Sequence, residues 1–160
     1  SFLDLHGASW AYNEPRSHSG FNVVRAHLAE FGRVDHFFGV VVESGAHLVS
    51  LEMVLDGQVD GSAIDSTVLE WLIGERAELS GEIRVIDSMG PSPIPPWVIS
   101  RQVPKRLRSD IRALLLGMHT EPFGRFMLDR ARIERFAAAQ DRDYDPIRAM
   151  ARKAQVVSFV

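Results

Sequence analysis

In the first half of the chain, short apolar runs alternate with stretches in which apolar residues recur at helical spacing. The short runs predict strands at residues 8–12, 37–42, 61–64 and 83–87. Between them, apolar stripes that begin at Val23, Leu48 and Val68 predict helices. Strands that alternate with helices in this way are typical of a parallel sheet with helices packed on its faces. The pattern therefore predicts an α/β fold.

The pattern changes at residues 89–96, which contain four prolines. Proline lacks the backbone N–H that helices and central strands require, so this stretch predicts a crossing between two lobes. Beyond it, apolar spacing predicts a long helix over residues 104–118 and two shorter helices near 124–139 and 146–154.

Charge is distributed unevenly along the 160 residues. Residues 1–100 hold five Lys and Arg against fourteen Asp and Glu, a net charge of −9, whereas residues 101–160 hold thirteen against seven, a net charge of +6. The basic residues of the second part alternate with Asp and Glu, which favours a solvated helical face over a nucleic-acid-binding surface. The split itself indicates that the two parts lie in different environments.

Composition excludes several kinds of site. The chain has no cysteine, which excludes disulfides, thiolate metal sites and a cysteine nucleophile. No apolar run approaches the ~20 residues that span a bilayer. The first residues also lack the basic and apolar regions of a signal peptide.

Three loops follow the first three predicted strands, and in a parallel sheet all three open on the edge where ligands bind. The first holds Ser17 and Ser19, either of which can cap the next helix, and Gly20, which lets a ligand approach the backbone. Free N–H groups in a first helical turn bind anions, and serine hydroxyls add uncharged donors. The alternative is an ordinary capping motif, which needs a single serine.

Five further residues at this edge are candidate ligand contacts. His47 begins the second helix and could donate to an oxyanion, or it could face solvent. Asp65 could accept the proton of a P–O–H group, hold a ligand ammonium, or cap the third helix beside Ser66. His18 ranks below its serine neighbours. Tyr12 could wall the pocket or be a core aromatic.

Three motifs resemble the phosphate, phosphite and phosphonate-binding proteins of ABC importers. Residues 11–21, read as AYNEPRSHSGF, resemble the signature loop of that family, with His18 where the family has Thr. Residues 44–47, read as SGAH, look like its Gly-x-His segment, and residues 59–66, read as VDGSAIDS, are similar to its strand ending in aspartate. The resemblance extends in order from about residue 4 to residue 154.

The resemblance implies a two-lobed periplasmic-binding-protein fold of type II. Residues 1–92 would form the ligand-binding second lobe. Residues 93–160 would cross the hinge and return as helices to a first lobe whose N-terminal part is absent here. Binding by these residues alone is therefore expected to be weak or absent, and the exposed lobe face could drive homodimer formation.

The implied function is binding, not catalysis, with no cofactor or metal. The protein would capture a small phosphorus oxyanion in the periplasm, or as a cell-surface lipoprotein, and deliver it to an ABC permease. An effector domain of a regulator with the same fold is the main alternative. A hydrolase is disfavoured because no Gly-x-Ser-x-Gly motif is present. The donors around His18, His47 and Asp65 favour an anion over a metal.

Overall fold

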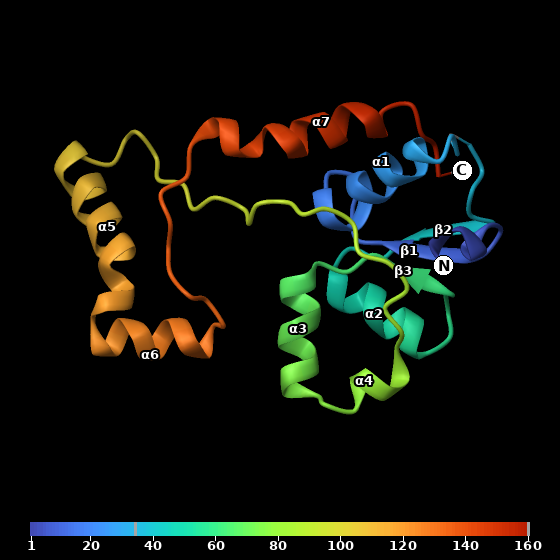
Figure 1. The fold of residues 1–160 in the computed structure, drawn as a ribbon, viewed down its shortest axis with the longest axis horizontal. Coiled ribbons are helices and arrows are strands. Elements are labelled where there is room, and N and C mark those ends of the chain that lie inside the picture. Colours follow the sequence, from blue (N-terminus) through green and yellow to red (C-terminus); the bar gives the residue numbers. More distant parts are fainter. Residues whose placement is uncertain (34, 160) are drawn as a thin grey trace. The chain divides into compact units, whose positions relative to one another are not determined.

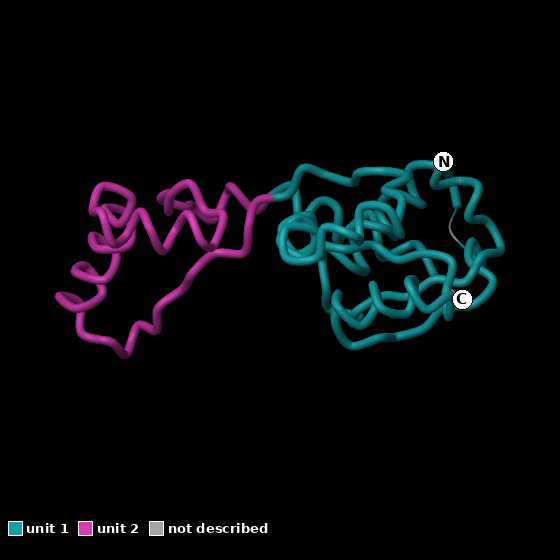
Figure 2. Tube along the Cα trace, turned by 90° about the horizontal axis from the view of Figure 1, so that it is seen from below, with its two compact units in different colours: residues 1–92, 145–160 teal, residues 93–144 magenta. Residues whose placement is uncertain are grey.

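The computed structural model describes residues 1–33 and 35–159, so Val34 and Val160, which the predicted lobes include, lie outside the described residues. The chain divides into two compact units (Figure 2). Unit 1 comprises Ser1–Ser92 and Asp145–Val160, and unit 2 comprises Pro93–Tyr144. The first boundary falls within the predicted proline-rich crossing.

Unit 1 is built around a parallel sheet with strand order β2-β1-β3. Its strands are β1 (Ser9–Tyr12), β2 (Val40–Glu43) and β3 (Gly61–Ser62). Ser9 is in register with Val40, and Trp10 is in register with both Val41 and Gly61. The sheet is parallel as predicted, so the carboxyl ends of its strands share one edge.

Helices cover both faces of this sheet, with α1 and α7 on one side and α2, α3 and α4 on the other (Figure 1). A short 3-10 helix, η1 (Phe2–Leu5), precedes β1, and a π-helical turn, η2 (His18–Asn22), leads directly into α1. The helices of this unit are α1 (Val23–Glu30), α2 (His47–Leu55), α3 (Ser66–Glu75), α4 (Leu79–Glu82) and α7 (Asp145–Ala154).

Each face has its own hydrophobic core. On the α1 side, aromatic rings pack in ordered pairs: Phe2 stacks on Phe37 with ring centroids 5.6 Å apart, and Trp10 stacks on Phe38 at 4.6 Å. On the other side, one leucine from each helix forms a smaller cluster, namely Leu51, Leu72 and Leu79. These two cores hold the strand ends, and hence the loops that follow them, in place.

Unit 2 consists of helices and extended segments. Its elements are α5 (Lys105–Gly117), η3 (Met118–Thr120), α6 (Pro122–Arg130) and η4 (Asp141–Tyr144). Buried residues in this unit are confined to Gly124 and Leu128, and α5 has none. A Cβ atom on Gly124 would overlap the Met118 carbonyl, so this glycine is what lets α6 pack against η3.

Two sequence-based expectations need correction. Residues 83–87 form no strand: Ile83 ends α4, and Val85 and Ile86 are exposed with no neighbouring strand to bond them. The helix expected near 124–139 ends at Arg130. Within the described chain, residues 145–159 pack in unit 1, where α7 lies against α1. The assignment of residues 93–160 to another lobe of a larger fold stays a prediction.

None of the helices in residues 1–33 and 35–159 is long and apolar enough to span a bilayer.

Candidate functional site

The first predicted loop forms a capped helix start. Ser17 has an extended backbone, and its Oγ accepts a hydrogen bond from the Gly20 N–H at 3.1 Å. The Ser17 carbonyl accepts from the Asn22 N–H, also at 3.1 Å, which closes the π-helical turn. The capping role expected for this loop is therefore present. The first N–H groups of such a turn have no acceptor within the helix and carry partial positive charge.

The first and second loops meet through a hydrogen bond between Ser19 Oγ and His47 Nε2, which are 2.9 Å apart. His47 is the first residue of α2, and its ring is half-buried. Gly20 packs against the same ring: a Cβ on this glycine would lie 3.2 Å from His47 Cε1 and would overlap the Asn13 side chain. Glycine is thus required here because two side chains approach its Cα closely.

The third loop contributes Asp65, the N-cap of α3. Its Oδ1 accepts from the Thr67 N–H at 3.0 Å and from the Thr67 hydroxyl at 2.6 Å, so the capping role is again present. Burial acts to raise the pKa of Asp65, but the Thr67 hydrogen bonds and the nearby His47 together bring it below the ordinary value of 3.8. An ionised carboxylate accepts about four hydrogen bonds, which leaves capacity for a ligand proton. Ser66 begins α3 with its side chain exposed.

Burial favours the neutral form of both histidines of the site. Burial lowers the pKa of His47 and of His18 below the ordinary 6.5, and the negative charge of Asp65 opposes that shift in each case. The Ala63 carbonyl also favours the charged form of His47, although it forms no hydrogen bond of good geometry with Nδ1. Asp65 therefore lies within electrostatic range of both imidazole rings.

Buried polar atoms without a protein partner gather at this edge. Among the described residues there are seven such side-chain atoms, and four belong here: Asn13 Oδ1, His18 Nδ1, His47 Nδ1 and Ser62 Oγ. Buried polar groups are costly unless they are hydrogen-bonded. Donors and acceptors in this number indicate a site that binds a polar ligand. No group of three His, Asp or Glu side chains within residues 1–33 and 35–159 is arranged to hold a metal ion.

The structure brings five of the seven predicted residues together. Ser17, Ser19, His47 and Asp65 join the three loops, and His18 adjoins them while bonding through Nε2 to Ser92 Oγ at 2.8 Å. Ser66 directly follows Asp65, and its side chain is exposed. Tyr12 is the exception.

The Tyr12 ring lies in the aromatic core on the α1 side. Strand alternation places it on the same face as Trp10. Its ring contacts Phe21 at 4.8 Å and Phe159 at 6.0 Å, and its hydroxyl donates to Glu43 Oε2 at 3.3 Å. The structure thus gives Tyr12 the contacts of a core aromatic.

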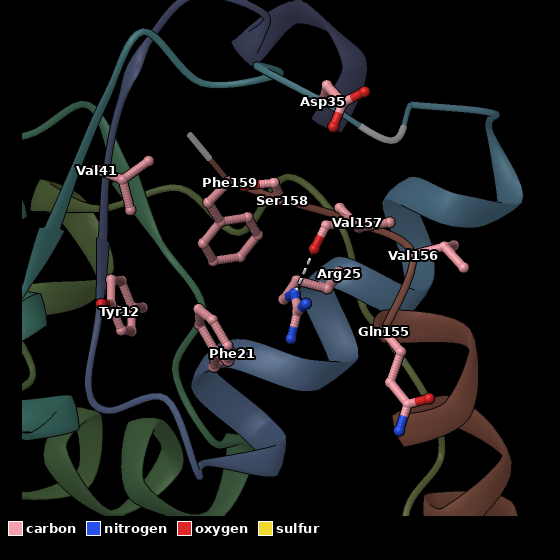
Figure 3. A pocket seen from close by; sticks show the side chains of 10 residues that line it. All are labelled: Tyr12, Phe21, Arg25, Asp35, Val41, Gln155, Val156, Val157, Ser158 and Phe159. Carbon is pink, nitrogen blue, oxygen red and sulfur yellow. Dashed lines mark hydrogen bonds between the residues drawn. The ribbon is translucent and has the colours of Figure 1, made fainter.

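Tyr12 also lines a cavity of about 410 Å³ between α1 and the C-terminal segment (Figure 3). Arg25, the cation of this cavity, donates through Nε to the Val157 carbonyl at 2.8 Å and lies over the Phe21 ring. None of Ser19, His47 and Asp65 lines the cavity. Because its cation is already used to hold the C-terminal segment, we favour the loop edge as the functional site.

Three residues of this edge were not identified from the sequence. Asn13 lies against Gly20, Ser62 ends β3 with an unpartnered hydroxyl, and Ser92 reaches His18 from the proline-rich crossing. Asn13 had a signal, since it directly follows a predicted strand. Ser62 lies within the motif of residues 59–66 but was not singled out there. Ser92 had no signal, because it neither starts a helix nor follows a recognisable motif.

Comparison with known proteins gives this geometry a context. The chain is similar in fold to the structure of PhnD1 from Prochlorococcus marinus (MIT 9301) in complex with methylphosphonate, with a TM-score of 0.73 and 16% sequence identity. The match covers 96% of this chain and 59% of that chain. The chain therefore spans less than two thirds of that relative, and at this identity the likeness concerns the fold. No curated protein matches the chain.

The profile of one protein family matches residues 1–144, which is most of the chain. That family is described as the periplasmic substrate-binding protein of phosphonate ABC transporters, a transport component and not an enzyme. By this match, the chain belongs to the family of periplasmic substrate-binding proteins of ABC transporters for phosphonate.

Proposed function

We propose that unit 1 binds a small phosphorus oxyanion (a phosphonate, phosphite or phosphate) for import across the inner membrane. The observation that carries the proposal is the hydrogen bond of 2.9 Å between Ser19 and His47, with Asp65 beside them at the same sheet edge. It joins residues of separate loops into one polar site. Methylphosphonate, the ligand of PhnD1, is the natural first probe.

The chemistry of the site suits an anion that carries a proton. The first turn of η2 and the Ser17 and Ser19 hydroxyls supply donors without a formal charge. Asp65 is ionised, so it attracts a ligand P–O–H and repels a fully ionised oxyanion. A phosphorus oxyanion whose second pKa lies near ~6 carries such a proton on about half of its molecules at pH 6, whereas sulfate carries none. Asp65 would therefore act as the selectivity residue.

The remaining partners follow from the family. The loaded protein would dock on an ABC permease, and it would reside in the periplasm or be held at the membrane as a lipoprotein. Dimer formation through unit 2, whose apolar side chains are exposed, stays a prediction that sedimentation velocity tests.

The test is a titration of the 15N-labelled chain with methylphosphonate, phosphite, phosphate and sulfate at pH 6, followed by amide chemical shifts. Of the two outcomes expected for these residues alone, weak or absent binding, the proposal requires weak binding, and titration to millimolar concentrations detects it. Amides of residues 17–20, 47 and 65–67 should move with the phosphorus oxyanions. The double variant Ser17→Ala/Ser19→Ala should weaken binding at least about tenfold.

Two further variants, one a control and one a test of selectivity, complete the titration. Ser109→Ala removes an exposed hydroxyl on α5 in unit 2 and should leave affinity unchanged. Asp65→Asn should reduce the ratio between the Kd for sulfate and the Kd for methylphosphonate. If the amides of residues 17–20 stay fixed in the unsubstituted protein, the proposed function is wrong.

A further inference from the structure

Ser92 touches the candidate site from a distant part of the chain. Its Oγ lies 2.8 Å from His18 Nε2, across 74 positions of sequence. Both side chains are half-buried. Ser92 is also the last residue of unit 1 before the chain enters unit 2 at Pro93.

The protons available on the imidazole and on the hydroxyl decide which group donates in this bond. A neutral imidazole has one N–H and one bare nitrogen, and a serine hydroxyl has one proton to donate. Ser92 Oγ has a second neighbour, Met150 Sδ, at 4.0 Å. A thioether is a weak acceptor, so the imidazole nitrogen at 2.8 Å is the better destination for the hydroxyl proton.

If Ser92 donates this hydrogen bond, the position of the imidazole proton of His18 follows. If Nε2 accepts, the imidazole proton is on Nδ1, which is buried and has no protein partner. An N–H in that position is a donor that an oxyanion can use, whereas a bare nitrogen would repel it. The partner of one ring nitrogen commonly sets the tautomer of histidines in this way.

We propose that Ser92 is a positioning residue of the anion site, whose hydroxyl donates to His18 Nε2 and keeps the imidazole proton on Nδ1 as a donor to the ligand. The inference rests on the proposed function and deepens it. It gives His18 a donor role that depends on a residue outside the three loops. It also ties the site to the segment that leads into unit 2.

The experiment reads the tautomer directly, through the 15N chemical shifts of the His18 ring in the ligand-free protein above pH 7. The unsubstituted protein should show a protonated Nδ1 and a bare Nε2. Ser92→Ala should give a mixture of both tautomers, and Ser92→Thr, which keeps the hydroxyl, should restore the original pattern. Ser88→Ala, an exposed serine of the same segment, is the matched control and should change nothing.

Affinity gives the second readout. Ser92→Ala should weaken methylphosphonate binding about fivefold, the size of one neutral hydrogen bond, and Ser92→Thr should recover it. Adding Ser92→Ala to His18→Ala should cause no further loss, because Ser92 acts through His18.

The outcomes separate this inference from the proposed function. A proton on Nε2 in the unsubstituted protein, or the same tautomer in Ser92→Ala, overturns the role of Ser92 without any ligand present. An additive loss of affinity in the double variant overturns it as well. Absent amide shifts at residues 17–20 overturn the proposed function, and with it the affinity effect, even if the tautomer is as expected.

Discussion

Unit 1 buries a set of large apolar side chains around a sheet, whereas unit 2 leaves most of its own exposed. In unit 1, Leu28 and Val24 are fully buried and Trp10 is 3% exposed. In unit 2, large apolar residues on the helices and the extended segments are open to solvent, including Trp97, Val98, Leu107, Ile111, Leu114, Phe123 and Phe126.

The difference shows that apolar spacing alone does not make a core. Leu107, Ile111 and Leu114 recur at helical spacing along α5, yet all three remain exposed. Burial stabilises by about 25 cal/mol per Å² of apolar surface, so a stripe that remains exposed contributes little. The candidate site lies in the unit that has cores, which suits a site whose side chains must be held in place.

A matched pair of leucine truncations tests this comparison with the largest expected effect. Leu28→Ala in unit 1 should lower the free energy of unfolding by about 2–5 kcal/mol, because it leaves a cavity in the aromatic core. Leu114→Ala, at a side chain 68% exposed, should change it by less than about 0.5 kcal/mol. Urea denaturation measures both. Equal losses would mean that unit 2 is as well packed in solution as unit 1.

A glycine pair sharpens the comparison within unit 1. Gly20→Ala should cost about 1–3 kcal/mol, because the new Cβ would overlap the Asn13 side chain. Gly81→Ala in α4 meets no atom within 4 Å and should be neutral or slightly stabilising. Thermal unfolding measures both, and adding Asn13→Ala to Gly20→Ala should recover part of the loss. A harmless Gly20→Ala would contradict the close packing at the site.

Lowering the pH from 7.5 to 5.5 should destabilise unit 1 by a smaller amount. Burial holds the pKa of His18 and His47 below 6.5, so the unfolded chain binds protons first as the pH falls. The stability is therefore complete above pH 6.5 and is lost as the pH drops through the folded-state pKa values. Asp65 titrates below this range, since its pKa is lowered from 3.8.

The measurement is urea denaturation across this pH range, with the double variant His18→Gln/His47→Gln as its control. The variant should show a flatter dependence of unfolding free energy on pH. An equal slope in both proteins would assign the pH effect to other groups.

The smallest effect is expected for a surface ion pair. Lys153 Nζ on α7 lies 2.8 Å from Glu30 Oε1 on α1, and both side chains are more than half exposed. Lys153→Ala should cost less than about 1 kcal/mol, and added salt should reduce the difference further. A larger loss in urea denaturation would mean that α7 depends on charge and not on the core beneath it.

Much of the fold of unit 1 could be predicted because its elements bury one face each. Short apolar runs predicted β1 and β3 nearly at their bounds, and helical stripes predicted α1, α2 and α3. The strand expected at residues 83–87 failed for a physical reason. Val85 and Ile86 belong to an apolar run. A strand also needs a neighbouring strand with which to form hydrogen bonds, and a local sequence pattern does not specify that neighbour.

The site was predictable to the extent that it follows from topology. Parallel strands bring their carboxyl ends together, so Ser19, His47 and Asp65 could be expected to converge. Tyr12 was ambiguous because its position at a strand end allowed both roles, and its face was settled by packing against Phe21. The Ser92–His18 bond was out of reach, since no local rule pairs residues 74 positions apart.

The chain leaves unit 1 after Ser92 and re-enters it at Asp145, and this path has a consequence for biosynthesis. Val157 and Phe159 belong to the aromatic core of unit 1, and the Arg25 guanidinium bonds the Val157 carbonyl. A ribosome releases the N-terminal residues first. In the nascent polypeptide, Phe2, Trp10 and Phe38 therefore stay incompletely covered until Val157 and Phe159 have emerged, so chaperone binding should be strongest in that interval.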